Sequence, residues 1–551
     1  MTPEIKFNEI INSPQERILD LSRQKDKVRN IPVCLIIPPS SFLADERVFP
    51  FLGILKVAAQ LRDNGNEVDV IDCSGYGNPD EIVKKYIDEH PSVKTFGLTA
   101  TTPQIVSCGK ILQQIRDSSH DSKVILGGTH ATLTHAGYLQ ELKTGTERGR
   151  ATVALSQLNE LFDTIVAGDG EMSIFYAIDN ENNQKLIDAG NLSSPLFIKR
   201  GELDQYTPAA RELIDHESYK YYIDGKRAAS LIAQLGCPFE CGFCGGRDSQ
   251  FLRMIRTRTI PNIIDEMGQI IDSSKNWEEP IRAIMFYDDE LNVSPQNLEN
   301  LCKALIDYQA ESGLELRFRG FVKAELFTQE QANLMYKAGF REVLSGVESG
   351  SDLMLKAMRK HTSRDINSRC VKYAHNAGLN FKALMSLGHP GESYETIQES
   401  IDWVKDNLRV GDQVDWTVIT VFFGTPYSDR ATYIKEDDVW VYETKVLDDK
   451  TKTTKILKLY SKRTDQFLDA QFYKGIPDGY KAYVWTDFIT QDELVTQRGR
   501  AENETRAHLN LPHIQSVTEM QYEHTMGMPG NSNEALPSKI LRSSKTIYSA
   551  N

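Results

Sequence analysis

Short apolar runs alternate with amphipathic segments along most of this 551-residue chain, and this alternation limits the possible folds more than any other feature. Five runs of strand length open the series, at residues 33–39, 67–72, 95–100, 123–128 and 162–168. The segments between them, such as 51–63 and 104–118, place apolar residues on one helical face. Buried strands alternating with helices predict a doubly wound, Rossmann-like α/β domain with a parallel sheet, which binds ligands at the carboxyl ends of its strands.

A second series of the same kind follows further along the chain. Its strand-like runs lie at 229–235, 282–290, 314–320, 342–350, 380–388 and 414–423, with amphipathic helical segments between them. Six strands joined by crossover helices again predict a parallel α/β arrangement. Beyond residue 426 the pattern changes to β-rich runs and then to a helix that begins at Thr490, with Glu493 three residues later, so we expect a small α+β region there.

Three cysteines open the second series at a tight and regular spacing. Residues 231–248 read LIAQLGCPFECGFCGGRD, which places Cys237, Cys241 and Cys244 in a C-x3-C-x2-C run. The glycines and the proline of this stretch exclude regular structure, so we expect a loop that leaves the end of a strand. Thiolates gathered this closely are soft ligands for an iron–sulfur cluster or for zinc, and three of them leave one metal position without a protein ligand.

Zinc is the alternative that needs a further ligand. A closed tetrahedral zinc site takes a fourth Cys or His close to the first three. The next cysteine after the loop is Cys302 and the next histidine is His361, whereas structural zinc sites usually pair two short knuckles. The spacing therefore favours an iron–sulfur cluster with an open corner.

Charge and composition exclude several classes of partner. The chain has 63 basic and 77 acidic residues, a formal net charge of −14, which disfavours nucleic acid and anionic membranes as partners. We find neither a signal-peptide core nor a run of about 18 apolar residues, so we expect a cytoplasmic protein. Eight cysteines in so long a chain do not make a disulfide framework, and a reducing compartment is what an exposed cluster requires.

The loop resembles the signature of the radical S-adenosylmethionine (SAM) enzymes, C-x3-C-x-aromatic-C, with Phe243 as the aromatic residue. The resemblance implies a partial (β/α)6 barrel and a [4Fe–4S] cluster held by the three cysteines, with SAM on the fourth iron and Phe243 beside its adenine. Further SAM contacts are implied at the strand ends, at Asp288, Asp289, Glu290, Arg319, Lys323, Glu348 and Gly388. A single aspartate at this position is equally suited to capping a helix.

Small and hydroxyl-bearing residues also collect at the strand ends of the first domain. They are Thr99, Thr101, Thr102, Gly127, Gly128, His130, Gly168, Asp169, Gly170 and Glu171. Small side chains let the backbone approach a large flat or anionic ligand, although glycines also end strands in any such sheet. The set resembles the cobalamin-binding domain that precedes many radical SAM cores. His130 is then either a ligand of the lower face of cobalt or a residue hydrogen-bonded to the corrin or to backbone.

Together these features predict the following division of the chain: a leader (1–30), a cobalamin-binding domain (31–180), a linker (181–228), a radical SAM partial barrel (229–426), a substrate-side region (427–512) and a disordered tail (513–551). The resemblance implies an electron from a donor such as a flavodoxin or ferredoxin, and a 5′-deoxyadenosyl radical that abstracts a hydrogen atom from an unactivated carbon of a small-molecule substrate. Methylcobalamin would then supply a methyl group.

Three hypotheses about function follow from this reading. The first is a cobalamin-dependent radical SAM methyltransferase. The second is a cobalamin-containing cyclase or oxidoreductase of the same family, which shares the first half-reaction. The third is a non-catalytic metal or corrin carrier, which would leave the polar residues at the strand ends of the second domain unexplained.

Overall fold

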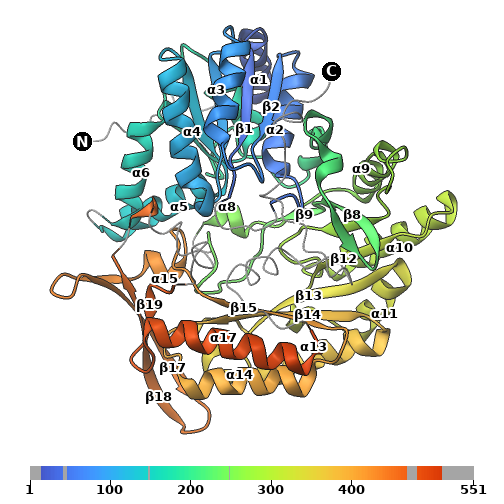
Figure 1. The fold of residues 1–551 in the computed structure, drawn as a ribbon, viewed down its shortest axis with the longest axis vertical. Coiled ribbons are helices and arrows are strands. Elements are labelled where there is room, and N and C mark those ends of the chain that lie inside the picture. The colour runs from blue at the N-terminus through green and yellow to red at the C-terminus, as the bar shows by residue number, and fades with distance from the viewer. Residues whose placement is uncertain are drawn as a thin grey trace. The chain divides into compact units, whose positions relative to one another are not determined.

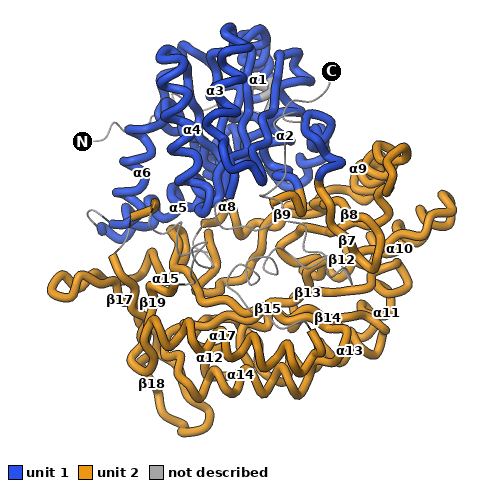
Figure 2. Tube along the Cα trace, viewed as in Figure 1, with its two compact units in different colours: residues 1–41, 50–218, 538–551 blue, residues 42–49, 219–537 orange. Residues whose placement is uncertain are grey.

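The computed structural model describes residues 14–40, 46–146, 149–246, 249–463, 465–467 and 481–511. The chain divides into two compact units, one made of residues 1–41, 50–218 and 538–551 and the other of residues 42–49 and 219–537 (Figure 2). The stretch predicted as a disordered tail, 513–551, lies outside the described residues. Among the helices that the structure describes, none has the length and apolar character needed to cross a bilayer.

A six-stranded sheet of order β2-β1-β3-β4-β5-β6 forms the centre of the first unit (Figure 1). Every pairing in this sheet is parallel, which confirms the predicted sheet type. In chain order the helices and strands are α1 (Pro14–Val28), β1 (Val33–Ile37), α2 (Leu52–Asp63), β2 (Val68–Asp72), α3 (Pro79–Glu89), β3 (Thr95–Thr99), α4 (Ile105–Ser118), β4 (Lys123–Gly127), α5 (Thr129–Thr144), α6 (Arg150–Leu161), β5 (Thr164–Gly168), α7 (Gly170–Ala177) and β6 (Leu186–Ala189).

Strand β6 lies in the stretch that the sequence assigned to a linker. It pairs with β5 over the register Ile165 to Leu186 through Gly168 to Ala189, so the first sheet extends beyond residue 180. Its four residues are too few to show a pattern of their own in the sequence. The strand is identified by its pairing partner rather than by its apolar content.

Glycines at the carboxyl rim of this sheet are held in conformations that other residues avoid. Gly128 has φ +96° and Gly168 has φ +95°. A Cβ on Gly168 would lie 2.3 Å from the backbone nitrogen of Gly190, so the rim has no room for a side chain there. The left-handed conformation adds a backbone cost for any residue with a Cβ.

Gly168→Ala is therefore expected to destabilise the first unit by at least about 1–3 kcal/mol, the cost of backbone strain alone. Gly109→Ala is the matched control, because Gly109 lies in α4 with no atom within 4 Å of an added Cβ. That substitution should stabilise its helix by about 0.5–1 kcal/mol. Hydrogen exchange of the β5 amides measures both effects, and equal protection in the two variants would contradict the steric reading.

The second unit is built on a seven-stranded sheet of order β15-β14-β13-β12-β11-β8-β7, parallel from β8 to β15. It is the curled sheet of a half-barrel, with β7 added antiparallel at one edge. Its elements are β7 (Tyr221–Ile223), β8 (Lys226–Leu231), β9 (Gln234–Leu235), α8 (Gln250–Arg253), β10 (Arg256–Thr257), α9 (Ile260–Ser273), β11 (Ala283–Phe286), α10 (Pro295–Ser312), β12 (Arg317–Phe321), α11 (Gln329–Ala338), β13 (Phe340–Glu348), α12 (Asp352–Ala357), α13 (Arg364–Ala377), β14 (Asn380–Leu387), α14 (Tyr394–Asn407) and β15 (Gln413–Val418).

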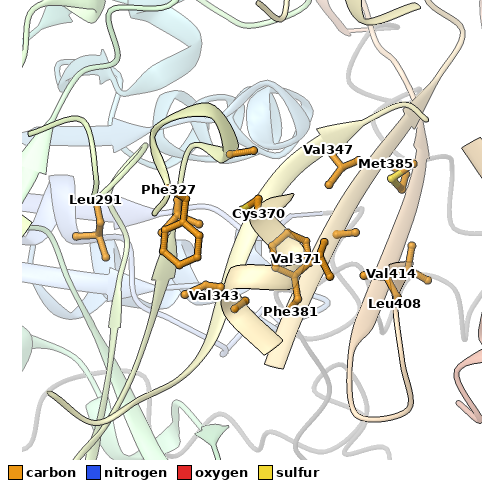
Figure 3. Packing of buried hydrophobic residues seen from close by; sticks show 14 of the residues in the cluster. Leu291, Phe327, Val343, Val347, Cys370, Val371, Phe381, Met385, Leu408 and Val414 are labelled. Atoms are coloured by element: carbon orange, nitrogen blue, oxygen red, sulfur yellow. The ribbon is translucent and has the colours of Figure 1, made fainter. Parts of the chain in front are cut away.

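Alternate residues of these strands face two different cores. Side chains such as Val343 of β13 and Phe381 of β14 pack with Cys370 and Val371 of α13 in the main hydrophobic cluster (Figure 3). Side chains one position away face the inside of the half-barrel, where Ala283 and Met285 of β11 join a smaller apolar cluster. The inner and outer faces of each strand are thus both buried, as parallel strands require.

Part of the inner cluster comes from a distant stretch of sequence. Residues 46–49 belong to the second unit although they precede α2 of the first. Phe49 lies against Tyr221 with ring centroids 4.7 Å apart, and the backbone amide of Lys220 donates to the carbonyl oxygen of Arg47 at 3.0 Å. The guanidinium of Arg47 stands over the ring of Tyr219. These contacts seat the short segment on the half-barrel.

A C-terminal region closes the sheet beyond β15. It comprises α15 (Pro426–Asp429), β16 (Thr432–Ile434), β17 (Val439–Asp448), β18 (Thr453–Lys462), β19 (Val484–Trp485) and α17 (Gln491–His508), with β16 to β19 in one antiparallel sheet. Helix α17 packs on β15, where Arg498 Nε donates to the carbonyl oxygen of Trp416 at 2.9 Å. The predicted terminal helix and α+β region are both present.

Candidate functional site

The cysteine loop is held in place through its backbone. The amide of Gly242 donates to the carbonyl oxygen of Met358 at 2.8 Å, and the amide of Tyr427 donates to the carbonyl oxygen of Gly242 at 3.0 Å. A Cβ on Gly242 would lie 2.4 Å from the Tyr427 ring. The loop is thus clamped between the end of α12 and the start of α15, with no space for a larger residue at its centre.

The chemistry of the loop suits an iron–sulfur cluster. Cys241 is buried, and Cys237 and Cys244 are partly exposed. In the described part of the chain, no three His, Cys, Asp or Glu side chains are gathered so as to hold a single metal ion. Three thiolates of one loop are the ligand type of a [4Fe–4S] cluster, in which each binds a different iron. The donor set therefore fits the group.

The acidic residues after β11 have different surroundings. Asp288 is buried, and its Oδ1 accepts from the amide of Ala233 at 2.7 Å. Ala233 lies between β8 and β9, and beyond it Gln234 and Leu235 pair with β10, so the strand predicted over 229–235 is divided between two sheets. Burial raises the pKa of Asp288 to about 7. Asp289 is exposed, whereas Glu290 is half-buried and desolvation raises its pKa to about 7.

Two buried lysines stand among carboxylates at these strand ends. Lys323 Nζ lies 3.0 Å from Glu325 Oε1, and Lys360 Nζ lies 3.1 Å from Glu348 Oε1. The neighbouring Glu348, Cys241 and Glu290 raise the pKa of Lys360 against the effect of burial. The ammonium of Lys360 also stands 5.8 Å from the centre of the Phe243 ring. Through these charged side chains, the ends of β11, β12 and β13 are connected to the cysteine loop.

An irregular backbone sets the direction of the Glu348 side chain. The register between β13 and β14 shifts between Gly346 and Glu348, which is a bulge, and Glu348 has φ +63°. Bulges re-aim a side chain at the end of a strand. A Cβ on Gly346 would meet the Glu348 carboxylate and the Lys360 ammonium at 2.4 and 2.8 Å, so only glycine leaves room for this ion pair.

The end of β14 forms a closed turn. Gly388 has φ +87°, and its amide donates to Glu392 Oε2 at 3.2 Å while the Thr396 hydroxyl donates to Glu392 Oε1. Burial raises the pKa of Glu392 to about 7. Both oxygens of this carboxyl group bind within the turn, so Glu392 shapes the backbone at Gly388 rather than facing a ligand.

Glu392→Gln is expected to alter how stability depends on pH. A group with a higher pKa in the folded state binds more protons there, so the free energy of unfolding falls as the pH rises from about 4.5 to about 7. The glutamine variant lacks this contribution and should gain stability relative to the parent over that range. Urea unfolding at pH 5 to 8 measures the difference, and parallel curves for the two proteins would contradict the shift.

The remaining predicted contacts take varied positions. Arg319 lies within β12, where its Nε is 2.5 Å from Glu342 Oε1 in a buried pair inside the half-barrel. Burial lowers the pKa of this guanidinium. Phe243 packs edge-on against His389, with ring centroids 5.2 Å apart. The structure thus gathers Glu290, Lys323 and Glu348 near Phe243 and the rest of the cysteine loop, and it gives Arg319 a partner on the neighbouring strand.

The predicted residues of the first unit gather at the carboxyl rim of its sheet. Thr102 Oγ1 lies 3.0 Å from Nδ1 of the buried His130, and Thr101 caps the turn before α4. Asp169 Oδ2 accepts from the amide of Ile198 at 3.0 Å, and Glu171 Oε1 lies 3.6 Å from Lys56 Nζ. Parallel strands bring these ends to one edge, where such sheets bind ligands.

Four residues at the site in the second unit were not predicted from the sequence as ligand contacts. Lys360, Ser386, His389 and Tyr427 surround Glu348 and Phe243, yet only His389 adjoins a predicted contact in the sequence. The signal available for His389 was its place in the glycine-rich stretch 388–392. Nothing in the local sequence marks the other three.

Two family models match the chain. The radical SAM superfamily matches residues 231–404, and the B12 binding domain matches residues 46–159. An uncharacterised methyltransferase of Pyrococcus horikoshii is 24% identical over 403 residues, which are 71% of this chain and 81% of the relative. The anaerobic magnesium-protoporphyrin IX monomethyl ester cyclase of Rubrivivax gelatinosus is 24% identical over 384 residues, which are 66% of this chain and 63% of the relative.

A solved structure has the same fold over most of its length. The radical SAM methyltransferase TsrM from Kitasatospora setae, with tryptophan substrate and a SAM analogue bound, aligns with a TM-score of 0.52 at 18% identity. The alignment covers 72% of this chain and 74% of that one. A second structure of the same protein holds cobalamin and a [4Fe–4S] cluster.

Proposed function

From the premise that this chain belongs to the B12-binding radical SAM enzymes, we propose that it is a methyltransferase acting on an unactivated carbon of a small molecule. Enzymes of this family use a [4Fe–4S] cluster, SAM and cobalamin, and these are the cofactors of the chain. When bound, the cluster and SAM supply a carbon radical, and cobalamin supplies a methyl group. The protein binds and orients these cofactors and excludes water around them.

The cysteine loop carries the proposal for the second unit. Cys237, Cys241 and Cys244 would hold the cluster, because they are the cysteines of the clamped loop at the strand ends of the half-barrel. Phe243 would lie beside the adenine of SAM, opposite the edge of His389. Gly388 has no side chain, and its positive φ and closed turn fix its backbone, so this backbone would be able to approach that side of the nucleoside.

Charge supports SAM as the ligand of the same strand ends. Three carboxylates, Glu290, Glu325 and Glu348, accompany the two ammonium groups of Lys323 and Lys360, which gives a formal charge of −1 when all are ionised. SAM carries a sulfonium and an ammonium against one carboxylate, so a net anionic site complements it. Asp289 and Glu290 would face its amino group, and Glu348 the ribose hydroxyls.

The rim of the first unit would hold cobalamin. Thr99, Gly127, Gly128 and Gly168 offer small side chains and backbone groups at the ends of β3, β4 and β5. Tight packing behind Gly168 keeps this rim rigid. The proposed role of His130 is to hold the loop after β4 through Thr102, to which it is hydrogen-bonded.

Methyl transfer is the first candidate because several relatives are named as methyltransferases, while two relatives are named as cyclases. The cyclase is the second candidate for that reason. The electron donor remains the small redox protein proposed from the sequence, a flavodoxin or ferredoxin. Nothing else in the described site separates the two reactions, because both begin with the same cofactors.

Reconstitution tests the proposal in two stages. Anaerobic loading with iron, sulfide and hydroxocobalamin is expected to give about four irons and about one cobalt per chain by metal analysis. Reduction in the presence of SAM and substrate should then form S-adenosylhomocysteine beside 5′-deoxyadenosine. Formation of 5′-deoxyadenosine and a converted substrate without S-adenosylhomocysteine would favour the cyclase, and zinc without iron would overturn both.

A further inference from the structure

A line of hydrogen bonds connects Tyr427, His389, Ser386, Glu348 and Lys360. The Tyr427 hydroxyl lies 3.2 Å from His389 Nδ1, and His389 Nε2 lies 2.7 Å from Ser386 Oγ. Ser386 Oγ lies 2.8 Å from Glu348 Oε2, and Lys360 Nζ lies 3.1 Å from Glu348 Oε1. The side chains come from four separate segments of the second unit and are almost wholly removed from water.

The direction of each bond follows from the chemistry of its members. A carboxylate only accepts, so the Ser386 hydroxyl donates to Glu348 and must accept from the Nε2–H of His389. Burial lowers the pKa of His389 to about 4, so the ring is neutral at pH 7 and its Nδ1 accepts from the Tyr427 hydroxyl. Every donor therefore points toward Glu348, and only one tautomer of His389 fits the line.

The backbone around this line is strained where it meets Glu348 and Lys360. Glu348 has φ +63°, and Lys360 stands between Arg359 at φ +56° and His361 at φ +58°. Non-glycine residues in this region each cost on the order of 1 kcal/mol. Three of them at one ion pair indicate that the fold is built to hold these two side chains in one arrangement.

Tyr427, at one end of the line of hydrogen bonds, contacts the cysteine loop. The Tyr427 ring fills the space where a Cβ on Gly242 would stand, and the Tyr427 amide donates to the Gly242 carbonyl oxygen. Its ring also contacts Tyr442 of β17, with centroids 4.7 Å apart. The same residue thus touches the loop with its backbone and ring and begins the hydrogen-bonded line with its hydroxyl.

We infer that Tyr427, His389 and Ser386 are positioning residues that fix the carboxylate of Glu348 for the nucleoside of SAM and tie its orientation to the cysteine loop. The inference rests on the proposed function only in taking Glu348 as the ribose contact. Each oxygen of Glu348 accepts one hydrogen bond from the line and keeps a lone pair for a ribose hydroxyl. None of the three positioning residues needs to contact SAM itself.

The test compares Tyr427→Phe, Ser386→Ala and the double variant in the full-length, cluster-loaded protein. The affinity for SAM is measured from the change that SAM causes in the electron paramagnetic resonance spectrum of the reduced cluster. Each single variant should weaken SAM binding by about 5- to 10-fold with unchanged iron content. Because both changes break the same line of hydrogen bonds, the SAM affinity of the double variant should be little lower than that of the single variant with the lower affinity.

Tyr483→Phe is the matched control, since it also removes a buried tyrosine hydroxyl, one that bonds to the backbone of Val421. It should leave SAM affinity unchanged. Unchanged affinity in Tyr427→Phe and Ser386→Ala, multiplying effects in the double variant, or an equal loss in the control would each overturn the inference. A parent protein that loads iron but does not respond to SAM would instead overturn the proposed function.

Discussion

Replacing Cys241 by alanine is expected to abolish assembly of the [4Fe–4S] cluster. The three cysteines of the loop would each bind one iron, and a cubane held by two thiolates and an exchangeable ligand is not retained. After anaerobic reconstitution the parent should hold about four irons per chain and the variant close to none. Iron and sulfide analysis measures this directly, and the charge-transfer absorbance of the cluster provides a second reading.

Cys302→Ala is the matched control for this prediction. Cys302 is fully buried in α10, where desolvation raises the pKa of its thiol to about 12, so it remains a thiol and packs as an apolar residue. Its loss should leave the iron content unchanged. Equal iron in Cys241→Ala and the parent, or equal losses in the two alanine variants, would refute the assignment of the loop.

The second large effect is expected from Lys360→Met. Lys360 and Glu348 form an ion pair whose side chains are 7% and 12% exposed, so removal of the ammonium leaves a buried carboxylate without its cation. Breaking such a pair on one side typically costs about 3–5 kcal/mol. The variant should also lose affinity for SAM, because Glu348 would no longer hold its orientation.

The chain offers a selective probe for this experiment. All five tryptophans, at 277, 403, 416, 440 and 485, lie in the second unit, so urea unfolding followed by tryptophan fluorescence reports on that unit. Lys303→Met is the control, because the Lys303 pair with Glu299 is 2.6 Å long but exposed and should contribute under about 1 kcal/mol. Similar midpoints for the two methionine variants would contradict a buried pair at Lys360.

Local sequence patterns were sufficient for much of the fold. Apolar runs and helical spacing predicted the first five strands and five of the six helices between residues 260 and 407, because both signals depend on neighbours within a few positions. The helix that was missed is α12, which has only six residues. Strands β6 and β7 were missed, since four and three residues are too short to show a period. The division of β8 from β9 was also missed, because β9 pairs with β10 about 20 positions further along the chain, a contact that local periodicity does not show.

The sequence motifs of the candidate site could be predicted, but the contacts between residues far apart in the sequence could not. The cysteine loop and the polar strand ends stand out because chemistry and spacing coincide there. Tyr427, Ser386 and Lys360 join them through contacts between residues 12 to 38 positions apart that only the folded chain brings together. Arg359 and His361, on either side of Lys360, have positive φ values without being glycines, so the sequence gives no sign of this backbone conformation.

The segment that carries Arg47 and Phe49 has a consequence for dissecting the chain. The half-barrel is not a contiguous module, because residues 46–49 complete its inner apolar cluster from a position upstream of α2. A fragment starting at Tyr219 would leave the Tyr221 ring without Phe49 and Tyr219 without the Arg47 guanidinium. Such a fragment would expose apolar surface and tend to aggregate, so residues 46–49 have to be present when the second unit is expressed.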